Sequence, residues 1–169
     1  AVFPAAYANL FSRHYLLMFA ILGALILRGL APEFYEQRHD ERWQRWWGRA
    51  FVVGSVTAPF FLGMVAANWL LGATTTVTLP GVVVGLTIVA LTVVDGVAYL
   101  RLKTRGDLRD DLRSDGYRAL AAYLVLVVTT LAYVYLAEPP LRSALLSPLV
   151  LGLVVATLAF AATYAVGMS

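Results

Sequence analysis

The sequence predicts an all-α membrane protein, a polytopic bundle of about five transmembrane helices. Of its 169 residues, 60% are hydrophobic and only 14% are charged, and the mean hydropathy is +0.75. So few polar side chains cannot cover a single soluble core. The hydrophobic residues are gathered in long uncharged runs, which indicates contact with lipid and excludes a soluble nucleic-acid binder. The sequence contains no cysteine, which excludes disulfides, iron–sulfur clusters and thiolate zinc sites.

Five of these runs are each long enough to cross a bilayer, because about 20 helical residues span the hydrocarbon. The first run ends near Arg28, a cation suited to a helix C-terminus. The third begins after Pro80, which is favoured in the first turn of a helix. The predicted helices, within a single transmembrane domain of residues 1–169, are residues 11–30, 50–71, 81–100, 120–137 and 145–166, with charged linkers at 31–49 and 101–118.

The basic residues predict the orientation of these helices. If the spans alternate, both charged linkers lie on one side of the membrane, and only Arg13 and Arg142 of the 13 Lys and Arg residues lie on the other. Basic residues are enriched on the cytoplasmic side, so we expect both linkers there and the threonine-rich tip at residues 72–80 outside. The residues on the linker side are Arg28, Arg38, Arg42, Arg45, Arg49, Arg101, Lys103, Arg105, Arg109, Arg113 and Arg118.

The first linker carries an arginine stripe beside a tryptophan stripe. Arg42, Arg45 and Arg49 follow i, i+3, i+7 spacing, and the neighbouring stripe contains three indoles, those of Trp43, Trp46 and Trp47. This pattern predicts a helix that lies flat among the lipid headgroups as an interfacial anchor. A specific lipid or quinone site is the alternative.

Of the acidic residues near the predicted spans, only Asp95 is a clear candidate for proton transfer, and no catalytic motif is present. Asp95 lies six residues before Arg101, about 9 Å of helix rise inside the membrane, where a carboxylate marks either an ion path or a structural hydrogen bond. Glu33 follows Arg28 at the predicted boundary, where an interfacial carboxylate and a snorkelling cation are the simpler interpretations.

Two further features have weaker signals. His14 and His39 are predicted at opposite faces of the membrane, so they cannot share a metal, and each is either a haem ligand or an ordinary interfacial imidazole. Gly81 and Gly85 form a GxxxG pattern, which would let another helix approach closely.

Several of these segments together resemble subunit II of the cytochrome bd quinol oxidases. The similarity lies in Arg28-Gly29-Leu30-Ala31-Pro32-Glu33-Phe34-Tyr35, Asp40-Glu41-Arg42-Trp43, Trp46-Trp47, Gly54-Ser55, Pro59, Gly63, Asn68 and Gly72, and in Gly96-Val97-Ala98-Tyr99-Leu100 with Lys103-Thr104-Arg105-Gly106-Asp107-Leu108. The helices that open and close the family's sequences have no counterpart, and the chain lacks an initiator Met. We therefore expect an internal part of a protein about twice as long.

The resemblance implies a multi-pass subunit of a quinol:O2 oxidoreductase in a prokaryotic inner membrane. Haems b and d and the quinol-binding loop are then expected in the partner, subunit I. The present chain would hold no cofactor and would not be competent alone. Glu33, the acidic residue of the matching segment, would belong to a cytoplasmic proton route, with Arg28 as a charge partner. Asp95 is expected to be a second member of that route because of its position inside the third span. Two alternatives are a transporter that uses Asp95 as its coupling carboxylate and a purely structural membrane subunit.

Overall fold

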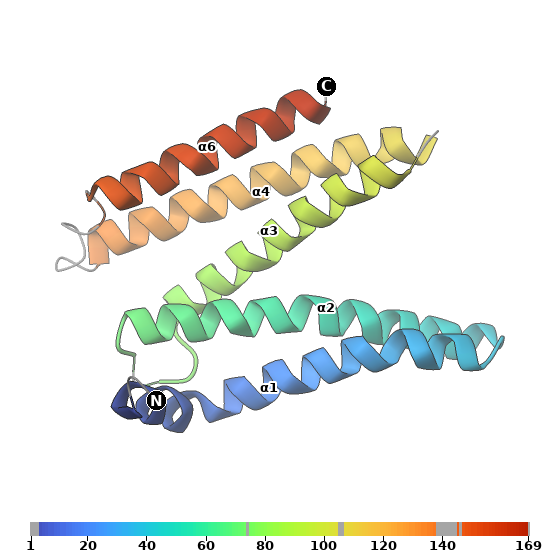
Figure 1. Cartoon of the computed structure of the whole chain (residues 1–169), viewed down its shortest axis with the longest axis horizontal. Helices are drawn as coiled ribbons and strands as arrows, with labels where there is room; N and C mark the ends of the chain where they lie inside the picture. The colour runs from blue at the N-terminus through green and yellow to red at the C-terminus, as the bar shows by residue number, and fades with distance from the viewer. Residues whose placement is uncertain (1–3, 74, 105–106, 138–144, 146, 169) are drawn as a thin grey trace. The chain divides into compact units, whose positions relative to one another are not determined.

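The computed structural model describes residues 4–73, 75–104, 107–137, 145 and 147–168, and all regular structure within these residues is α-helical (Figure 1). This confirms the predicted all-α fold. Within the described residues, five helices are long and apolar enough to cross a membrane. They are α1 (Pro4–Gln37), α2 (Glu41–Leu70), α3 (Leu79–Lys103), α4 (Asp107–Ala137) and α6 (Pro148–Met168).

The helices extend past the predicted spans into the charged segments. Only Arg38, His39 and Asp40 separate α1 from α2. Asp40 caps α2, its side chain accepting from the backbone N–H of Arg42 at 3.4 Å. A separate helix for the tryptophans is not formed, because they lie on the first turns of α2, which continues to Leu70. Their role as an interfacial anchor stays a prediction. Charge limits how far a segment enters hydrocarbon, but Glu and Arg favour helix and so do not end it.

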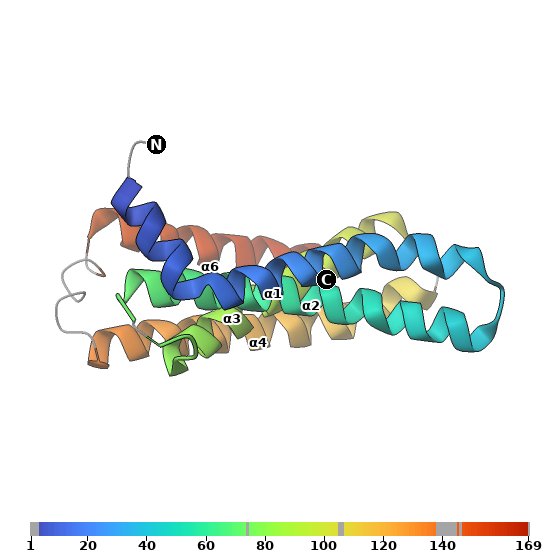
Figure 2. The ribbon, with the colours of Figure 1, turned by 90° about the horizontal axis from the view of Figure 1, so that it is seen from below.

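The chain forms two compact units, and the boundary between residues 89 and 90 lies within α3. In the first unit, α1 and α2 form an antiparallel pair and lie side by side in both views (Figures 1 and 2). Gly54 permits this close approach, since a Cβ there would lie 2.7 Å from the carbonyl oxygen of Ala24. The core of the unit contains Leu17, Met64 and Val65, with Met18, Ile21, Phe60, Phe61 and Val82 packed against them.

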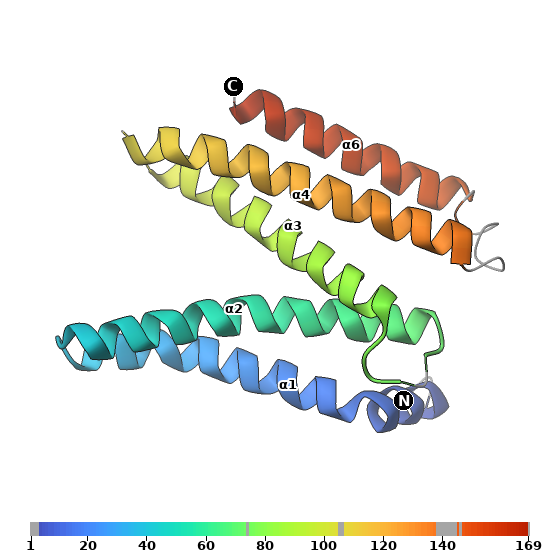
Figure 3. The same ribbon diagram turned by 180° about the vertical axis from the view of Figure 1, so that it is seen from behind.

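The second unit comprises the C-terminal part of α3 together with α4 and α6 (Figure 3). Its buried residues are Val94, Leu120, Tyr123 and Ala161. The Tyr164 hydroxyl donates to the carbonyl oxygen of Val94 at 3.3 Å. Many large apolar side chains on the outer faces of both units are exposed, as expected for helices that contact lipid or other helices.

Candidate functional site

An aromatic cluster joins the end of α1 to the start of α2. The Phe34 ring stacks on Trp47 with centroids 4.6 Å apart and an interplanar angle of 13°. Trp43 contacts both rings, and its Nε1 donates to the carbonyl oxygen of Phe34 at 2.5 Å. The Arg38 guanidinium lies 5.0 Å from the centre of the Trp43 ring. Cation–π attraction therefore adds to stacking, and together they fix the end of the α1–α2 pair.

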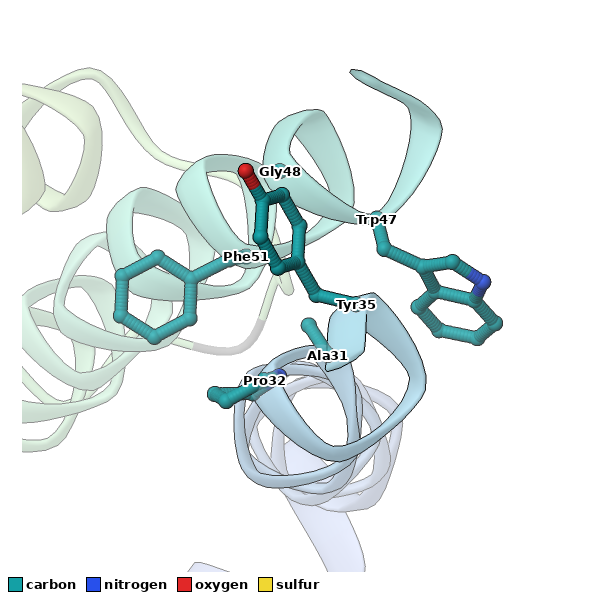
Figure 4. A pocket seen from close by; sticks show the side chains of 6 residues that line it. All are labelled: Ala31, Pro32, Tyr35, Trp47, Gly48 and Phe51. Carbon is teal, nitrogen blue, oxygen red and sulfur yellow. The ribbon is translucent and has the colours of Figure 1, made fainter. Parts of the chain in front are cut away.

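An apolar pocket of about 270 Å³ lies beside this cluster (Figure 4). A Cβ at Gly48 would lie 3.9 Å from Tyr35 Cε2, an ordinary van der Waals distance, so the Tyr35 ring lies directly over this position of α2. Pro32, the residue before Glu33, forms part of the wall, so the candidate carboxylate adjoins the pocket in sequence. The lining residues are Ala31, Pro32, Tyr35, Trp47, Gly48 and Phe51.

Glu33 and Arg28 both lie on α1 and are exposed. They are five residues apart, which separates them by about 140° around the helix and about 7.5 Å along it. No ion pair joins Arg28 to Glu33 in the part of the chain that the structure describes. Pro32 has no backbone N–H, so the Arg28 carbonyl lacks its usual donor one turn later. In a membrane such a carbonyl needs a hydrogen bond from water or from another polar group. This turn of α1 therefore carries the Glu33 carboxylate next to a backbone carbonyl without its helical hydrogen bond.

Asp95 lies on α3, and its side chain is exposed, whereas those of Val94 and Val97 on the same part of the helix are buried. It belongs to the second compact unit, whereas Glu33 and Arg28 belong to the first. A route that contains both carboxylates therefore stays a prediction.

The two histidines have different surroundings. His39 is exposed in the α1–α2 connection. His14 is 2% exposed and lies at a kink of α1, with φ −118° and ψ 20°. Neither of its ring nitrogens has a hydrogen-bond partner among the described residues, a burial that the sequence did not predict. Within those residues no three His, Asp or Glu side chains lie close enough to hold a metal ion.

The glycine pattern at the start of α3 acts as predicted. A Cβ at Gly85 would lie 2.7 Å from the carbonyl oxygen of Phe60, and a Cβ at Gly63 would lie 2.7 Å from the Cα of Gly85. The helix that approaches closely is therefore α2. A Cβ at Gly81 would lie 2.8 Å from Asn68 Oδ1, so the first glycine of the pattern accommodates a buried amide.

Asn68 holds the connection between α2 and α3 through hydrogen bonds, a role that was not predicted from the sequence, where Asn68 counted only as part of the family resemblance. Its side chain is fully buried, and Nδ2 donates to the carbonyl oxygen of Thr76 at 2.9 Å. The Thr78 hydroxyl donates to Asn68 Oδ1 and accepts from the backbone N–H of Gly81 at 3.0 Å. The sequence signal for this role was an amide side chain within an apolar run, because a buried polar group needs a hydrogen-bond partner.

Comparison with known proteins gives one consistent family. The family model described as cytochrome bd terminal oxidase subunit II matches residues 1–169. "Cytochrome bd-I ubiquinol oxidase subunit 2" of Escherichia coli K12 is 26% identical over 151 residues, which are 80% of this chain and 39% of the relative. "Cytochrome bd ubiquinol oxidase subunit 2" of Bacillus subtilis 168 is 26% identical over 140 residues, 76% of this chain and 41% of the relative. The chain thus spans about two fifths of the length of these curated relatives.

Proposed function

Because the chain belongs to the cytochrome bd terminal oxidase subunit II family, we propose that it works as part of subunit II of a quinol oxidase that reduces O2 to water. The observation that carries this proposal is the family match over all 169 residues. In this proposal the haems and the quinol site belong to a partner, subunit I, and this chain packs against that partner in the membrane. Haem supplies the electron transfer and oxygen chemistry, and this chain supplies structure and a path for protons.

Glu33 is the residue proposed to admit protons from the cytoplasm. Its position supports this role, because it is exposed at the polar end of α1 and next to the turn that Pro32 opens. Water bound at the Arg28 carbonyl would extend the polar path one turn toward the membrane interior. The positive charge of Arg28 would favour an ionised carboxylate close to that water. Asp95 is proposed as a second carboxylate of the same route.

The test is the Glu33→Gln variant in the full-length, assembled oxidase. Glutamine keeps the size and the hydrogen bonding of the side chain but cannot exchange a proton, so we expect quinol-dependent oxygen consumption per haem to fall by about tenfold or more. Asp95→Asn is expected to lower the same rate. The measurement is the rate with saturating quinol between about pH 6 and 8, normalised to the haem spectrum.

Glu36→Gln is the matched control, because Glu36 is also exposed on α1 and lies closer to the end of the helix. It should leave the rate unchanged. A Glu33→Gln oxidase that assembles with full haem and turns over at the native rate would make Glu33 structural or irrelevant to proton transfer, and the route would then have to start elsewhere.

The orientation proposed here has its own test. With the charged connections in the cytoplasm, a cysteine at exposed Ser114 on α4 should resist a membrane-impermeant thiol reagent in intact cells, whereas a cysteine at exposed Thr75 should react. Both should react in opened membranes. Labelling of Ser114→Cys from outside intact cells would reverse the proposed orientation.

A further inference from the structure

Three arginines lie on one face of the first turns of α2. Arg42 and Arg49 are seven residues apart, about 20° from each other around the helix, and Arg45 lies about 60° from Arg42. With Trp46 these side chains line a pocket of about 240 Å³. The face is distinct from the one that contacts α1, which carries Trp43 and Trp47 of the aromatic cluster.

The pocket has an excess of positive charge. All three guanidiniums are exposed. Arg45 is partly engaged, since it lies 3.8 Å from the Glu41 carboxylate and donates to the Glu41 carbonyl oxygen at 3.1 Å. Arg42 and Arg49 have no carboxylate within ion-pair distance in the described part of the chain. Two guanidiniums with several free donors therefore remain for an anion, and their planar geometry suits phosphate.

The same face becomes apolar toward the middle of α2. Val52, Val53 and Val56 follow Arg49 on this side of the helix and are 60%, 55% and 44% exposed. The distance from Arg49 to Val56 along the axis is about 10 Å. Trp46, 63% exposed, lies at the change from charged to uncharged residues, the position that indoles favour at a membrane interface.

We propose that this face of α2 binds an anionic phospholipid. The lipid phosphate lies between Arg42 and Arg49, Trp46 contacts the glycerol region, and one acyl chain lies along the exposed valines. A phospholipid matches both halves of the face, whereas an acidic protein segment would match the arginines and leave the valines without an apolar partner. The site does not depend on the proton route through Glu33, which lies on a different helix.

The experiment uses the full-length, assembled membrane complex in detergent micelles. Spin-labelled phosphatidylglycerol and spin-labelled phosphatidylcholine are added separately, and the motionally restricted fraction of each gives a relative association constant. We compare the native protein with Arg42→Gln/Arg49→Gln, with Arg42→Lys/Arg49→Lys, and with the control Arg113→Gln. Arg113 is exposed on α4, outside the lining of this pocket.

The native protein should prefer phosphatidylglycerol, and the double glutamine variant should lose about fivefold or more of that preference. A basic residue near the membrane surface contributes about 1 kcal/mol to attraction of anionic lipid, which is about fivefold. The double lysine variant should recover part of the preference, and Arg113→Gln should behave as native. Addition of inorganic phosphate should not displace the lipid, because it lacks the acyl chain.

Three outcomes would overturn the proposal. One is an unchanged lipid preference in the double glutamine variant. Another is displacement of phosphatidylglycerol by equimolar inorganic phosphate, which would make the pocket a simple anion site. The third is failure of the double glutamine variant to assemble with its partner subunit, which would assign the arginines to a protein interface.

Discussion

Replacement of Gly85 by valine is expected to prevent stable packing of α2 against the start of α3. A Cβ at this position would lie 2.7 Å from the Phe60 carbonyl oxygen and 2.9 Å from Phe60 Cδ2. A ring can rotate, but the carbonyl oxygen belongs to the α2 backbone, so the two helices must separate. Overpacking of this kind costs about 1–3 kcal/mol, and loss of the surrounding contacts adds to it. We expect a destabilisation of about 3 kcal/mol or more.

The measurement is thermal denaturation of the purified full-length protein, together with its yield in membranes. Gly96→Val is the control, because Gly96 is on the same helix and a Cβ there meets nothing within 4 Å. The control reports the effect of valine on helix propensity alone, which is below about 1 kcal/mol and favourable relative to glycine. Equal stability of the Gly85 and Gly96 variants would mean that the close approach of α2 and α3 does not stabilise the protein.

The sequence predicted that Gly81 and Gly85 would allow close approach, but it did not identify the partner. A GxxxG pattern reports a surface that another backbone can reach, and it contains no information on which helix reaches it. Gly63 supplies the opposing surface, and it is a single glycine without a pattern of its own. Long-range partners of this kind depend on the register of two helices, which a local pattern does not specify.

The predicted ends of the helices were less accurate than their existence. Runs without charge mark the part of a helix that can lie in hydrocarbon, whereas caps and propensity mark where a helix ends. Asp40 caps α2 far ahead of its apolar run, which is why the tryptophans lie on the same helix as that run and not on a separate one. The burial of His14 was also beyond the sequence, because it follows from the packing of α1 at its kink.

The candidate proton-route residues also show how far a local sequence pattern can predict function. Asp95 was identified by charge at a position where charge is costly, whereas Glu33 and Arg28 were assigned to the route by the resemblance to the family. All three side chains are exposed within the described residues. Charge patterns can therefore nominate such residues, but they do not show whether a path joins them.

The second large effect is expected at Asn68, where leucine should destabilise the turn between α2 and α3. Leucine has the same branched heavy-atom skeleton as asparagine but is bulkier and has no polar atoms. The carbonyl oxygen of Thr76 would lose its donor, and the Thr78 hydroxyl would lose its acceptor. A buried polar group left without a partner costs about 1–3 kcal/mol. Because Thr76 and Thr78 are half-buried, we expect a total loss of about 1–3 kcal/mol in the free energy of unfolding.

A double-mutant cycle with Thr78→Val separates the hydrogen bond from general effects on packing. In the native protein the Thr78 hydroxyl also accepts from the backbone N–H of Gly81, so Thr78→Val alone should be destabilising as well. If Asn68 and Thr78 act through one network, the double variant should be less destabilised than the sum of the single variants by about 0.5–3 kcal/mol. Thr75→Val is the control, because Thr75 is exposed in the same connection. Strict additivity of Asn68→Leu and Thr78→Val would contradict the network, and the stability of this turn would then come from the packing of Gly63 and Gly85 alone.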